Sequence, residues 1–380
     1  MAITLLSSPE TYSSLSDDVY FVVSSDNAGN LNFKFIFDIY INSTLVARLK
    51  NYPDPNSKGI VNVSNVIRNY WATYFKPNSN AALPYSGLDN YVEYTIQFGE
   101  EYGGVVYSNL TSTSAKTYNY YQPIFRNYSA SYYSTYGWLT NRSRNYINCL
   151  SSGSFFSTYK LNSAGTISLT VKKYSQDNTL LATQTGATSS SGTIHLINIS
   201  PTAINTYLGG SFINDDTFKY GVSVNNADEI YIYPVCNYKY NPETITFLNQ
   251  LGGYESYIFR NANRLNTTNQ KKSFESMAWK LNASNQMIKY DTYNKYNPGL
   301  NTYFNNAEYK YKFISDLLDA TDYTWINEMI NSTECYLHKN GYYYPINITT
   351  TNWEQKYKTD RNNTFITIDA EIGNINSQFR

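Results

Sequence analysis

Alternating apolar and polar positions recur along most of the chain and predict β-strands. Residues 33–49, FKFIFDIYINSTLVARL, alternate on both sides of Asn42-Ser43, where a hairpin turn is expected. Residues 91–100, YVEYTIQFGE, alternate in the same way and predict a further strand. The spacing becomes helical after Ser64, a residue type that caps helices. This first part of the chain therefore has the pattern of a β-sandwich with one short helical crossover.

The middle of the chain repeats this plan, which indicates an internal duplication. Residues 167–183 have the pattern of strand, turn and strand, and residues 218–235 mirror the last strand of the first part. The tripeptide Asn198-Ile199-Ser200 precedes a helical pattern, as Asn62-Val63-Ser64 does in the first part. We therefore expect tandem β-sandwich domains, the second duplicated from the first. Their expected bounds are 1–125 and 126–240.

Residues 241–380 mix strand and helix signals and predict a C-terminal α+β domain. A double glycine, Gly252-Gly253, separates two strand-like runs and predicts a sharp structural turn between them. Residues 312–332 carry apolar side chains at helical spacing, among them Phe313, Leu317, Trp325 and Met329. They predict two short helices broken near Thr321-Asp322, with Asp322 as the cap of the second and with Trp325 and Met329 packed inward. Further elements are expected as a strand at 272–281, a hairpin turn at Asn340-Gly341 and a closing strand at 363–373. The fold class predicted for the whole chain is mainly β, with tandem immunoglobulin-like β-sandwich domains and an α+β domain that contains a short helical segment.

Composition favours strands and protein contacts over nucleic-acid binding. The formal net charge of the 380 residues is +0, so there is no basic excess to neutralise phosphates. Charged residues make up only 15%, below the roughly 25% of ordinary soluble chains, while tyrosine occurs 41 times. Tyrosine favours strands and interfaces, although codon bias in an AT-rich genome would raise its count as well.

The segment 118–138 is dense in tyrosine and is a candidate subunit contact. Loops rich in tyrosine and serine share the chemistry of binding loops, whereas a solvated linker with codon bias explains the same composition. The candidate contact residues are Tyr118, Tyr120, Tyr121, Tyr128, Tyr132, Tyr133, Tyr136 and Trp138.

Residue types that carry chemistry are sparse and poorly spaced. Neither His195 nor His338 has a metal-ligand partner two or four residues after it. Cys335 and His338 are three apart, which on a strand points them to opposite faces. The double glycine lacks the pattern of a phosphate-binding loop, and the acidic pair Asp215-Asp216 lacks that of a calcium loop. We therefore predict no catalytic, cofactor-binding or metal-binding residue, and we do not expect an enzyme.

The cysteines and the N-terminal residues predict no disulfide, metal site or targeting signal. Cys149, Cys236 and Cys335 lie far apart and predict neither a disulfide framework nor a zinc site. The first residues, MAITLLSSPETYSS, lack the basic stretch and the long apolar core of a signal peptide. Because no run reaches about 18 apolar residues, no transmembrane helix and no membrane partner are expected.

Residues 247–259, FLNQLGGYESYIF, follow the pattern N-x-x-GG-[YF]-[DE]-x-[YF]-x-F. A similar string recurs, at the entry to a C-terminal region, in virion proteins of tailed phages that infect Bacteroidetes, the crAss-like phages among them, and the chain resembles those proteins. Residues 325–348, WINEMINSTECYLHKNGYYYPINI, resemble their helix followed by a Y-L-x-x-x-G-x-Y-x-P hairpin. The opening strand, loop and helix pattern and the closing TFITIDAEIGN are similar as well, whereas the resemblance is weakest over 105–240.

The resemblance implies a structural component of the virion, such as a tail, collar or neck ring protein that oligomerises and connects portal and tail parts. Its partners would be copies of itself, in a closed heterologous ring of about six or twelve, and other virion tail, collar or portal proteins, without sequence-specific nucleic acid. It would be found in the virion after assembly in the bacterial host cytoplasm. Two other functions stay open. One is a receptor- or carbohydrate-binding fibre or adhesin protein, because tyrosine and tryptophan rings stack on sugars. The other is a glycoside hydrolase, which needs two carboxylates facing one cleft.

Overall fold

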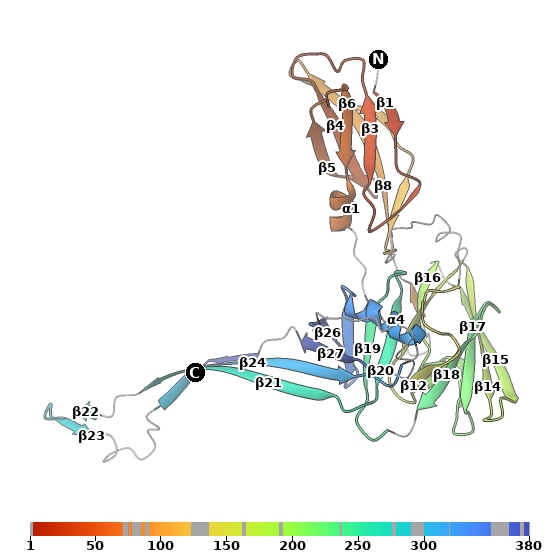
Figure 1. The fold of residues 1–380 in the computed structure, drawn as a ribbon, viewed down its shortest axis with the longest axis vertical. Coiled ribbons are helices and arrows are strands. Elements are labelled where there is room, and N and C mark those ends of the chain that lie inside the picture. Colours follow the sequence, from red (N-terminus) through yellow and green to blue (C-terminus); the bar gives the residue numbers. More distant parts are fainter. Residues whose placement is uncertain are drawn as a thin grey trace. The chain divides into compact units, whose positions relative to one another are not determined.

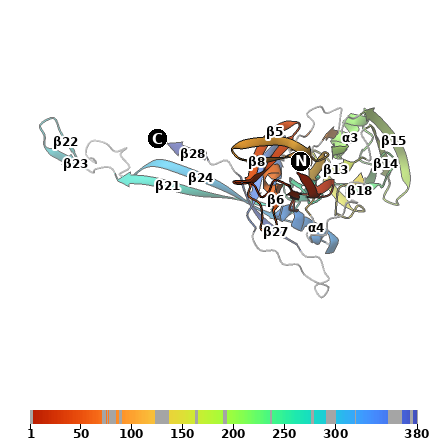
Figure 2. The same ribbon diagram turned by 90° about the horizontal axis from the view of Figure 1, so that it is seen from above.

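The computed structural model of the chain divides into two compact units (Figure 1, Figure 2). The first comprises Met1–Cys236 and Thr246–Tyr257, and the second comprises Asn237–Ile245 and Ile258–Arg380. Strands dominate, so the mainly β fold predicted from the sequence is confirmed. The structure describes residues 3–70, 75, 77, 85–87, 91–122, 137–161, 165–189, 193–235, 238–275, 279–289, 300–318, 320–350, 365–372 and 376–379.

The first β-sandwich packs two sheets around an aromatic core. Its elements are β1 (Thr4–Ser7), β2 (Tyr12–Ser14), β3 (Tyr20–Ser24), β4 (Lys34–Ile41), β5 (Thr44–Asn51), β6 (Lys58–Asn62), α1 (Ser64–Tyr70), β8 (Tyr91–Tyr102), β9 (Val105–Ser112) and β10 (Lys116–Asn119). One sheet has the order β1-β3-β6, and the other has the order β2-β10-β8-β4-β5, with β9 paired to β8. Phe21, Phe37 and Phe98 are fully buried in the core, where the Phe98 ring centroid lies 6.0 Å from that of Phe21 and 5.9 Å from that of Phe37.

The second β-sandwich is built from later residues and from one earlier strand. Its elements are β7 (Tyr85–Gly87), β11 (Gly137–Trp138), β12 (Ile147–Leu150), β13 (Phe156–Lys160), β14 (Thr166–Tyr174), β15 (Leu180–Ser189), β16 (Ile194–Asn198), α3 (Pro201–Leu208), β17 (Lys219–Val224) and β18 (Ile230–Val235). The sheets have the orders β11-β13-β16-β7 and β12-β18-β17-β14-β15. The earlier strand is β7, which pairs with β16 in antiparallel register. The predicted first domain therefore contributes a strand to the second sandwich.

The two sandwiches share one strand order. The sheet β1-β3-β6 corresponds to β11-β13-β16, and β2-β10-β8-β4-β5 corresponds to β12-β18-β17-β14-β15. In each larger sheet the two strands at one end of the order pair in parallel, β2 with β10 and β12 with β18, while the other pairs are antiparallel. A short helix follows the last strand of each smaller sheet, α1 after β6 and α3 after β16. This correspondence supports the internal duplication predicted from the sequence.

One hydrogen-bonded corner occurs in both sandwiches. Oδ1 of Asn62 accepts hydrogen bonds from the backbone N–H groups of Ser64 (3.0 Å) and of the residue before β3 (3.2 Å). Oδ1 of Asn198 accepts the same two bonds, from Ser200 (3.2 Å) and from the residue before β13 (3.1 Å). A single amide oxygen thus satisfies two backbone donors where a strand passes into a helix. The Asn-x-Ser tripeptide shared by the two halves is therefore a structural corner.

The C-terminal part is organised around one large sheet. Its elements are β19 (Glu243–Leu248), β20 (Tyr254–Phe259), β21 (Arg264–Glu275), β22 (Trp279–Leu281), β23 (Met287–Lys289), β24 (Leu300–Ile314), α4 (Ala320–Ile330), β25 (Cys335–Lys339), β26 (Tyr342–Ile348), β27 (Thr367–Ile372) and β28 (Asn376–Phe379). The sheet order is β20-β19-β25-β26-β27-β24-β21, with β28 also paired to β24, while β22 and β23 form a separate small sheet. In place of the strand predicted at 272–281, the structure has the end of the much longer β21 and the separate β22.

The helical segment is shorter than the apolar spacing predicts. Because β24 continues to Ile314 and α4 begins only at Ala320, the first of the two helices predicted within 312–332 is wrong. Phe313 instead lies on the same face of β24 as Tyr311, two residues earlier, and both rings are buried and stack with centroids 5.4 Å apart. Leu317 completed a helix-like spacing in the sequence, but its side chain is 61% exposed in the structure.

The second predicted helix and the hairpin that follows it are present. Trp325 and Met329 of α4 are buried, as predicted. Asp322 lies within the first turn of α4 and is not its cap, although a carboxylate there still complements the helix dipole. Asn340 and Gly341, with φ of 53° and 78°, form the tight turn between β25 and β26 that the sequence predicts.

Candidate functional site: an exposed β-arm and the recess at its base

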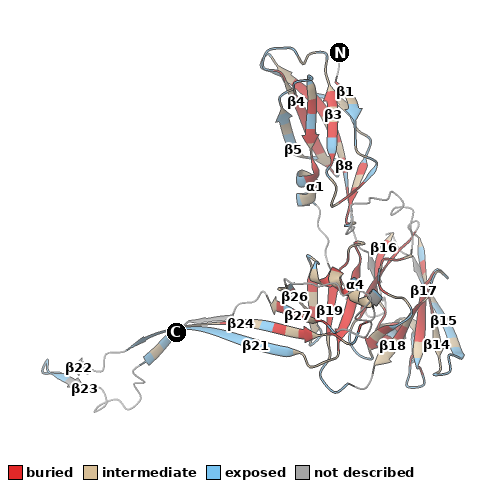
Figure 3. Cartoon of the chain, in the orientation of Figure 1, coloured by how far each residue is buried: buried red, intermediate tan, exposed pale blue. Residues whose placement is uncertain are grey.

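Residues 264–314, which contain the long hairpin of β21 and β24 and the small sheet of β22 and β23, are here called the arm. The hairpin is exposed over most of its length (Figure 3). All twelve residues of β21 are exposed, and β21 is the last strand of the sheet order. The register joins Arg264 to Lys312 at one end and Glu275 to Leu300 at the other, with a single irregularity between Lys272 and Ser273. At about 3.4 Å per residue, β21 is roughly 40 Å long. Its outer edge offers a row of backbone donors and acceptors to another strand.

Toward its far end, strand β24 of the arm has fewer neighbouring strands. Lys310–Ile314 of β24 also pair with β27, and Phe304–Ala307 also pair with β28. Beyond them, within the described part of the chain, Leu300–Tyr303 have β21 as their one neighbouring strand. A two-stranded ribbon without a packed face is marginally stable on its own in water. The far end of the arm therefore gains stability from any surface that covers it.

The far end of the arm also exposes large apolar side chains. Phe274 of β21 and Tyr303 of β24 place their ring centroids 6.3 Å apart. The exposed large apolar residues between residues 274 and 303 are Phe274, Leu281, Met287, Leu300 and Tyr303. Leu281 and Met287 pair with each other in the separate sheet of β22 and β23, whereas Phe274, Leu300 and Tyr303 lie at the end of the hairpin. An exposed apolar cluster such as that of Phe274 and Tyr303 is a feature of interaction surfaces.

The arm is basic, although the net charge of the whole chain is +0. Residues 264–314 contain eight Lys or Arg and three Asp or Glu, a net charge of +5, so the remainder of the chain carries −5. Near the base, ion pairs with β27 engage Lys310 (2.9 Å to Glu371) and Lys312 (3.8 Å to Asp369). Lys271 and Lys272 lie farther out and are exposed, with Nζ of Lys272 5.5 Å from the Phe304 ring centroid. The outer arm is thus a cationic surface next to apolar side chains.

An open recess of about 480 Å³ lies where β21 begins, within the second unit. Its walls carry the cations Lys239, Arg264 and Lys339 and the carboxylate of Glu243. Nζ of Lys339 donates hydrogen bonds to Glu243 Oε1 (3.1 Å) and to the hydroxyl of Tyr311 (3.3 Å). Partial burial alone would lower the pKa of Lys339, but these two hydrogen bonds outweigh it and raise the pKa. Three cations against one carboxylate make the recess favourable for an anionic group.

The double glycine lies in the turn between β19 and β20 and packs against the second sandwich within the first unit. Gly252 has a φ of 80°, which favours glycine. A Cβ added to Gly253 would lie 2.8 Å from Cβ of Thr158 and 3.1 Å from Cβ of Leu139. The first glycine thus provides the bend, and the second lets the turn approach strand β13 closely.

Asn249 holds this turn together. Its Oδ1 accepts hydrogen bonds from the backbone N–H groups of Leu251 (3.0 Å) and Gly253 (2.9 Å). Its Nδ2 donates to the backbone oxygen of Leu139 and to Oε2 of Glu255, both at 2.7 Å. The Asn, Gly-Gly and Glu positions of the string N-x-x-GG-[YF]-[DE] therefore all have structural tasks. These contacts give the string a structural role, which is to stabilise the turn between β19 and β20.

Several tyrosine candidates are core residues. Tyr118, Tyr120 and Trp138 are 0%, 3% and 3% exposed, so their rings are buried within the chain itself and are not a contact surface. The hydroxyl of Tyr118 donates to the backbone oxygen of Leu15 (2.8 Å), and Nε1 of Trp138 donates to that of Asp228 (3.0 Å). Buried Tyr and Trp need such partners for their polar ends, which the sequence does not reveal. Tyr121 is partly exposed, and the other four candidates, Tyr128, Tyr132, Tyr133 and Tyr136, lie outside the described residues.

The other residues considered for chemistry are dispersed. His195 is buried in β16, and the ring of His338 packs edge-on against Tyr343 with centroids 4.6 Å apart. Burial raises the pKa of the Cys335 thiol to about 12 and that of the Cys149 thiol further, so both are protonated near neutral pH. Across the described residues, no three His, Cys, Asp or Glu side chains are grouped so that they could hold a metal ion.

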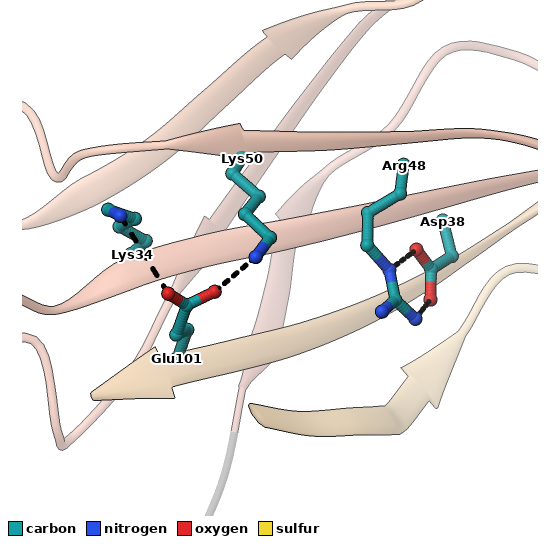
Figure 4. A network of polar contacts seen from close by, with 5 residues as sticks. All are labelled: Lys34, Asp38, Arg48, Lys50 and Glu101. Carbon is teal, nitrogen blue, oxygen red and sulfur yellow. Dashed lines mark hydrogen bonds and ion pairs between the residues drawn. The ribbon is translucent and has the colours of Figure 1, made fainter. Parts of the chain in front are cut away.

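Charged residues in the first sandwich form structural ion pairs that the sequence pattern did not predict (Figure 4). Asp38 is buried in the middle of the apolar strand β4, where Arg48 of β5 donates to its two oxygens from Nε (2.6 Å) and Nη2 (2.7 Å). Glu101 lies between Lys50 (2.5 Å) and Lys34 (3.7 Å), which lower its pKa. The signal for the first pair was an acidic residue inside an apolar strand, with a basic residue across the hairpin. Both groups bind neighbouring strands of one sheet together.

Comparison with known proteins adds no relative. No protein-family model matches the chain, and no curated protein matches it in sequence. In the part of the chain that the structure describes, no helix has the length and apolar character needed to cross a membrane.

Proposed function

We propose that the chain is a structural component of a tailed-phage virion, a tail, collar or neck ring protein that oligomerises and connects portal and tail parts. The observation that carries the proposal is the arm, because β21 offers twelve exposed residues at a sheet edge. Monomeric proteins usually shorten, cover or twist such an edge, since it invites pairing with other chains. A long uncovered edge is thus typical of a protein whose working state is an assembly.

The remaining architecture fits this role. Two sandwiches with the same strand order supply large folded modules. Their cores contain Tyr118, Tyr120 and Trp138, which the sequence offered as subunit-contact candidates. The sequence strings that resemble phage virion proteins include the Asn249 turn and the hairpin of β25 and β26, both of which have architectural tasks here. The partners proposed are copies of the chain, in a ring of about six or twelve, and other virion tail, collar or portal proteins.

A carbohydrate- or receptor-binding role is a second candidate, and the recess is the observation that favours it. Tyr240 and Tyr311 line the recess together with Asn241, Asn263 and Lys339. Aromatic rings beside amide and ammonium donors are suited to sugars, which present apolar faces and hydroxyl rims. Such a protein would bind glycans as an isolated chain.

Light scattering of the purified full chain, with negative-stain images of the same sample, tests both roles. Closed rings that form alone or after addition of portal complexes support the ring proposal. A trimer that binds glycans on an array, and that loses this binding when Tyr240 is replaced by alanine, supports the second role instead. A chain that assembles neither alone nor on portal complexes contradicts the ring proposal.

A further inference from the structure

We propose that the arm of one copy docks on the acidic body of a second copy of this chain. This inference rests on the proposed oligomeric function and names the contact that builds the oligomer. The charge distribution supports a second copy as the partner. Residues 264–314 carry +5 and the remainder of the chain carries −5. Lys310 and Lys312 already pair with Glu371 and Asp369 of the same chain, which leaves +3 on residues 264–314 and −3 on the remainder. Oppositely charged surfaces on one chain attract in a head-to-tail arrangement, in which each copy gives one surface and receives the other.

The acidic charge is concentrated on both sides of the arm in the sequence. Residues 1–120 contain seven basic and ten acidic residues, and residues 315–380 contain five basic and nine acidic residues, so they carry −3 and −4. Residues 121–263 carry nine basic and seven acidic residues, or +2. The acceptor surface is therefore assigned to residues 1–120 or 315–380, and the middle of the chain is not favoured.

Two features of the arm distinguish a protein partner from a nucleic acid. The backbone edge of β21 can pair with a strand, and main-chain hydrogen bonds of this kind are a recurring mode of protein recognition. The exposed Phe274, Leu281, Met287 and Leu300 would find no apolar surface on a phosphate backbone. On a folded protein they would be buried, which is where most of the stabilisation of a contact arises.

Zero-length cross-linking of mixed isotopic copies tests the contact directly. Equal amounts of ¹⁵N-labelled and unlabelled full chain are mixed, treated with a carbodiimide, and digested for mass spectrometry. We expect cross-links between Lys271 or Lys272 and an Asp or Glu of residues 1–120 or 315–380, with one peptide labelled and the other not. Cross-links from these lysines that never combine labelled and unlabelled peptides would overturn the proposal.

Two variants test whether the contact drives assembly. The first is the double reversal Lys271→Glu with Lys272→Glu. Its control reverses Lys173 and Lys219, which are partly exposed in the second sandwich, lie outside both the arm and the proposed acceptor, and change the net charge equally. The second replaces residues 275–300 by Asn-Gly, which closes the arm between the paired residues Phe274 and Asn301. At low salt we expect both arm variants to weaken self-association about tenfold or more, and the control to behave as wild type.

Sedimentation of the wild type and the variants, up to about 100 μM, decides the outcome. Unchanged assembly of both arm variants overturns the arm contact and leaves the proposed ring function standing. A wild-type chain that stays monomeric throughout overturns the arm contact as well, and the ring function then depends on the portal experiment. Binding of a 30-base-pair DNA duplex (about three helical turns) that is lost in the arm variants, without any self-association, assigns the arm to nucleic acid and overturns the proposal.

Discussion

Replacing Gly253 by alanine tests the explanation of the double glycine. The added methyl would lie 2.8 Å from Cβ of Thr158 and 3.1 Å from Cβ of Leu139. Both atoms are attached directly to the backbone, so neither can rotate away. Relief requires a backbone shift, and overpacking of this kind costs about 1–3 kcal/mol. The same substitution stabilises by about 0.4–1 kcal/mol through the unfolded chain, so we expect a net loss of roughly 1–2 kcal/mol.

Gly165→Ala is the matched control, since no atom lies within 4 Å of a Cβ built at Gly165 and its φ is not in the left-handed region. Both variants change the unfolded chain alike, so their difference isolates the packing at the turn. Because a chain of several modules need not unfold in one step, native-state hydrogen exchange of β13 and β20 is measured together with urea unfolding. If the two variants differ by less than about 0.5 kcal/mol, the turn accommodates a side chain and the explanation is refuted.

Three further substitutions test other contacts. Arg48→Met should destabilise the first sandwich by about 3–5 kcal/mol, because it leaves the Asp38 carboxylate buried without its guanidinium, whereas the double change Asp38→Leu with Arg48→Met should recover most of the loss in urea unfolding. Trp325→Ala should lower the free energy of unfolding by about 3–5 kcal/mol, and a loss under about 1 kcal/mol would mean that α4 does not bury this ring. Burial lowers the pKa of Lys160 to about 8, while its unfolded value stays near 10.5, so the unfolded state binds the extra proton between these values. The stability of wild type relative to Lys160→Met should therefore rise as the pH increases from 8 to 10.5, and a difference that stays flat across this window in parallel melts would contradict the assignment.

The sequence pattern correctly predicted those strands and turns whose geometry is set by neighbouring residues. The alternation of residues 91–100 gave a real strand, and Asn340-Gly341 gave a real hairpin, because side-chain period and turn geometry are properties of neighbouring residues. The same approach was wrong for residues 312–319. Phe313 and Leu317 matched a helical spacing, but Phe313 and Tyr311 also match the two-residue spacing of one strand face, and the pairing of β24 with its neighbours favoured the strand.

The subunit contact predicted from the tyrosine content required those side chains to be exposed, and composition does not show which side chains are buried. Tyr118 and Trp138 have the residue types of an interface, yet each is buried and donates a hydrogen bond to a distant backbone oxygen. The sequence did not predict the arm, because the strand that forms its edge has no apolar face. Residues 264–275 are polar on both faces, so β21 shows no hydrophobic alternation, and its strand conformation depends on pairing with β24.

The pairing of β7 with β16 has a consequence for the order of events during synthesis. His195 pairs with Gly87, which lies 108 residues earlier in the chain. At translation rates of 5–20 residues per second, the earlier strand waits about 5–20 s for its partner to be made. The elements of the first sandwich described here end at Asn119, so that module can complete its own sheets while residues 85–87 remain unpaired. A stop in translation before residue 194 would therefore leave a nascent chain with one folded module and an unmatched strand, and such a strand is a site for chaperones or for misassembly.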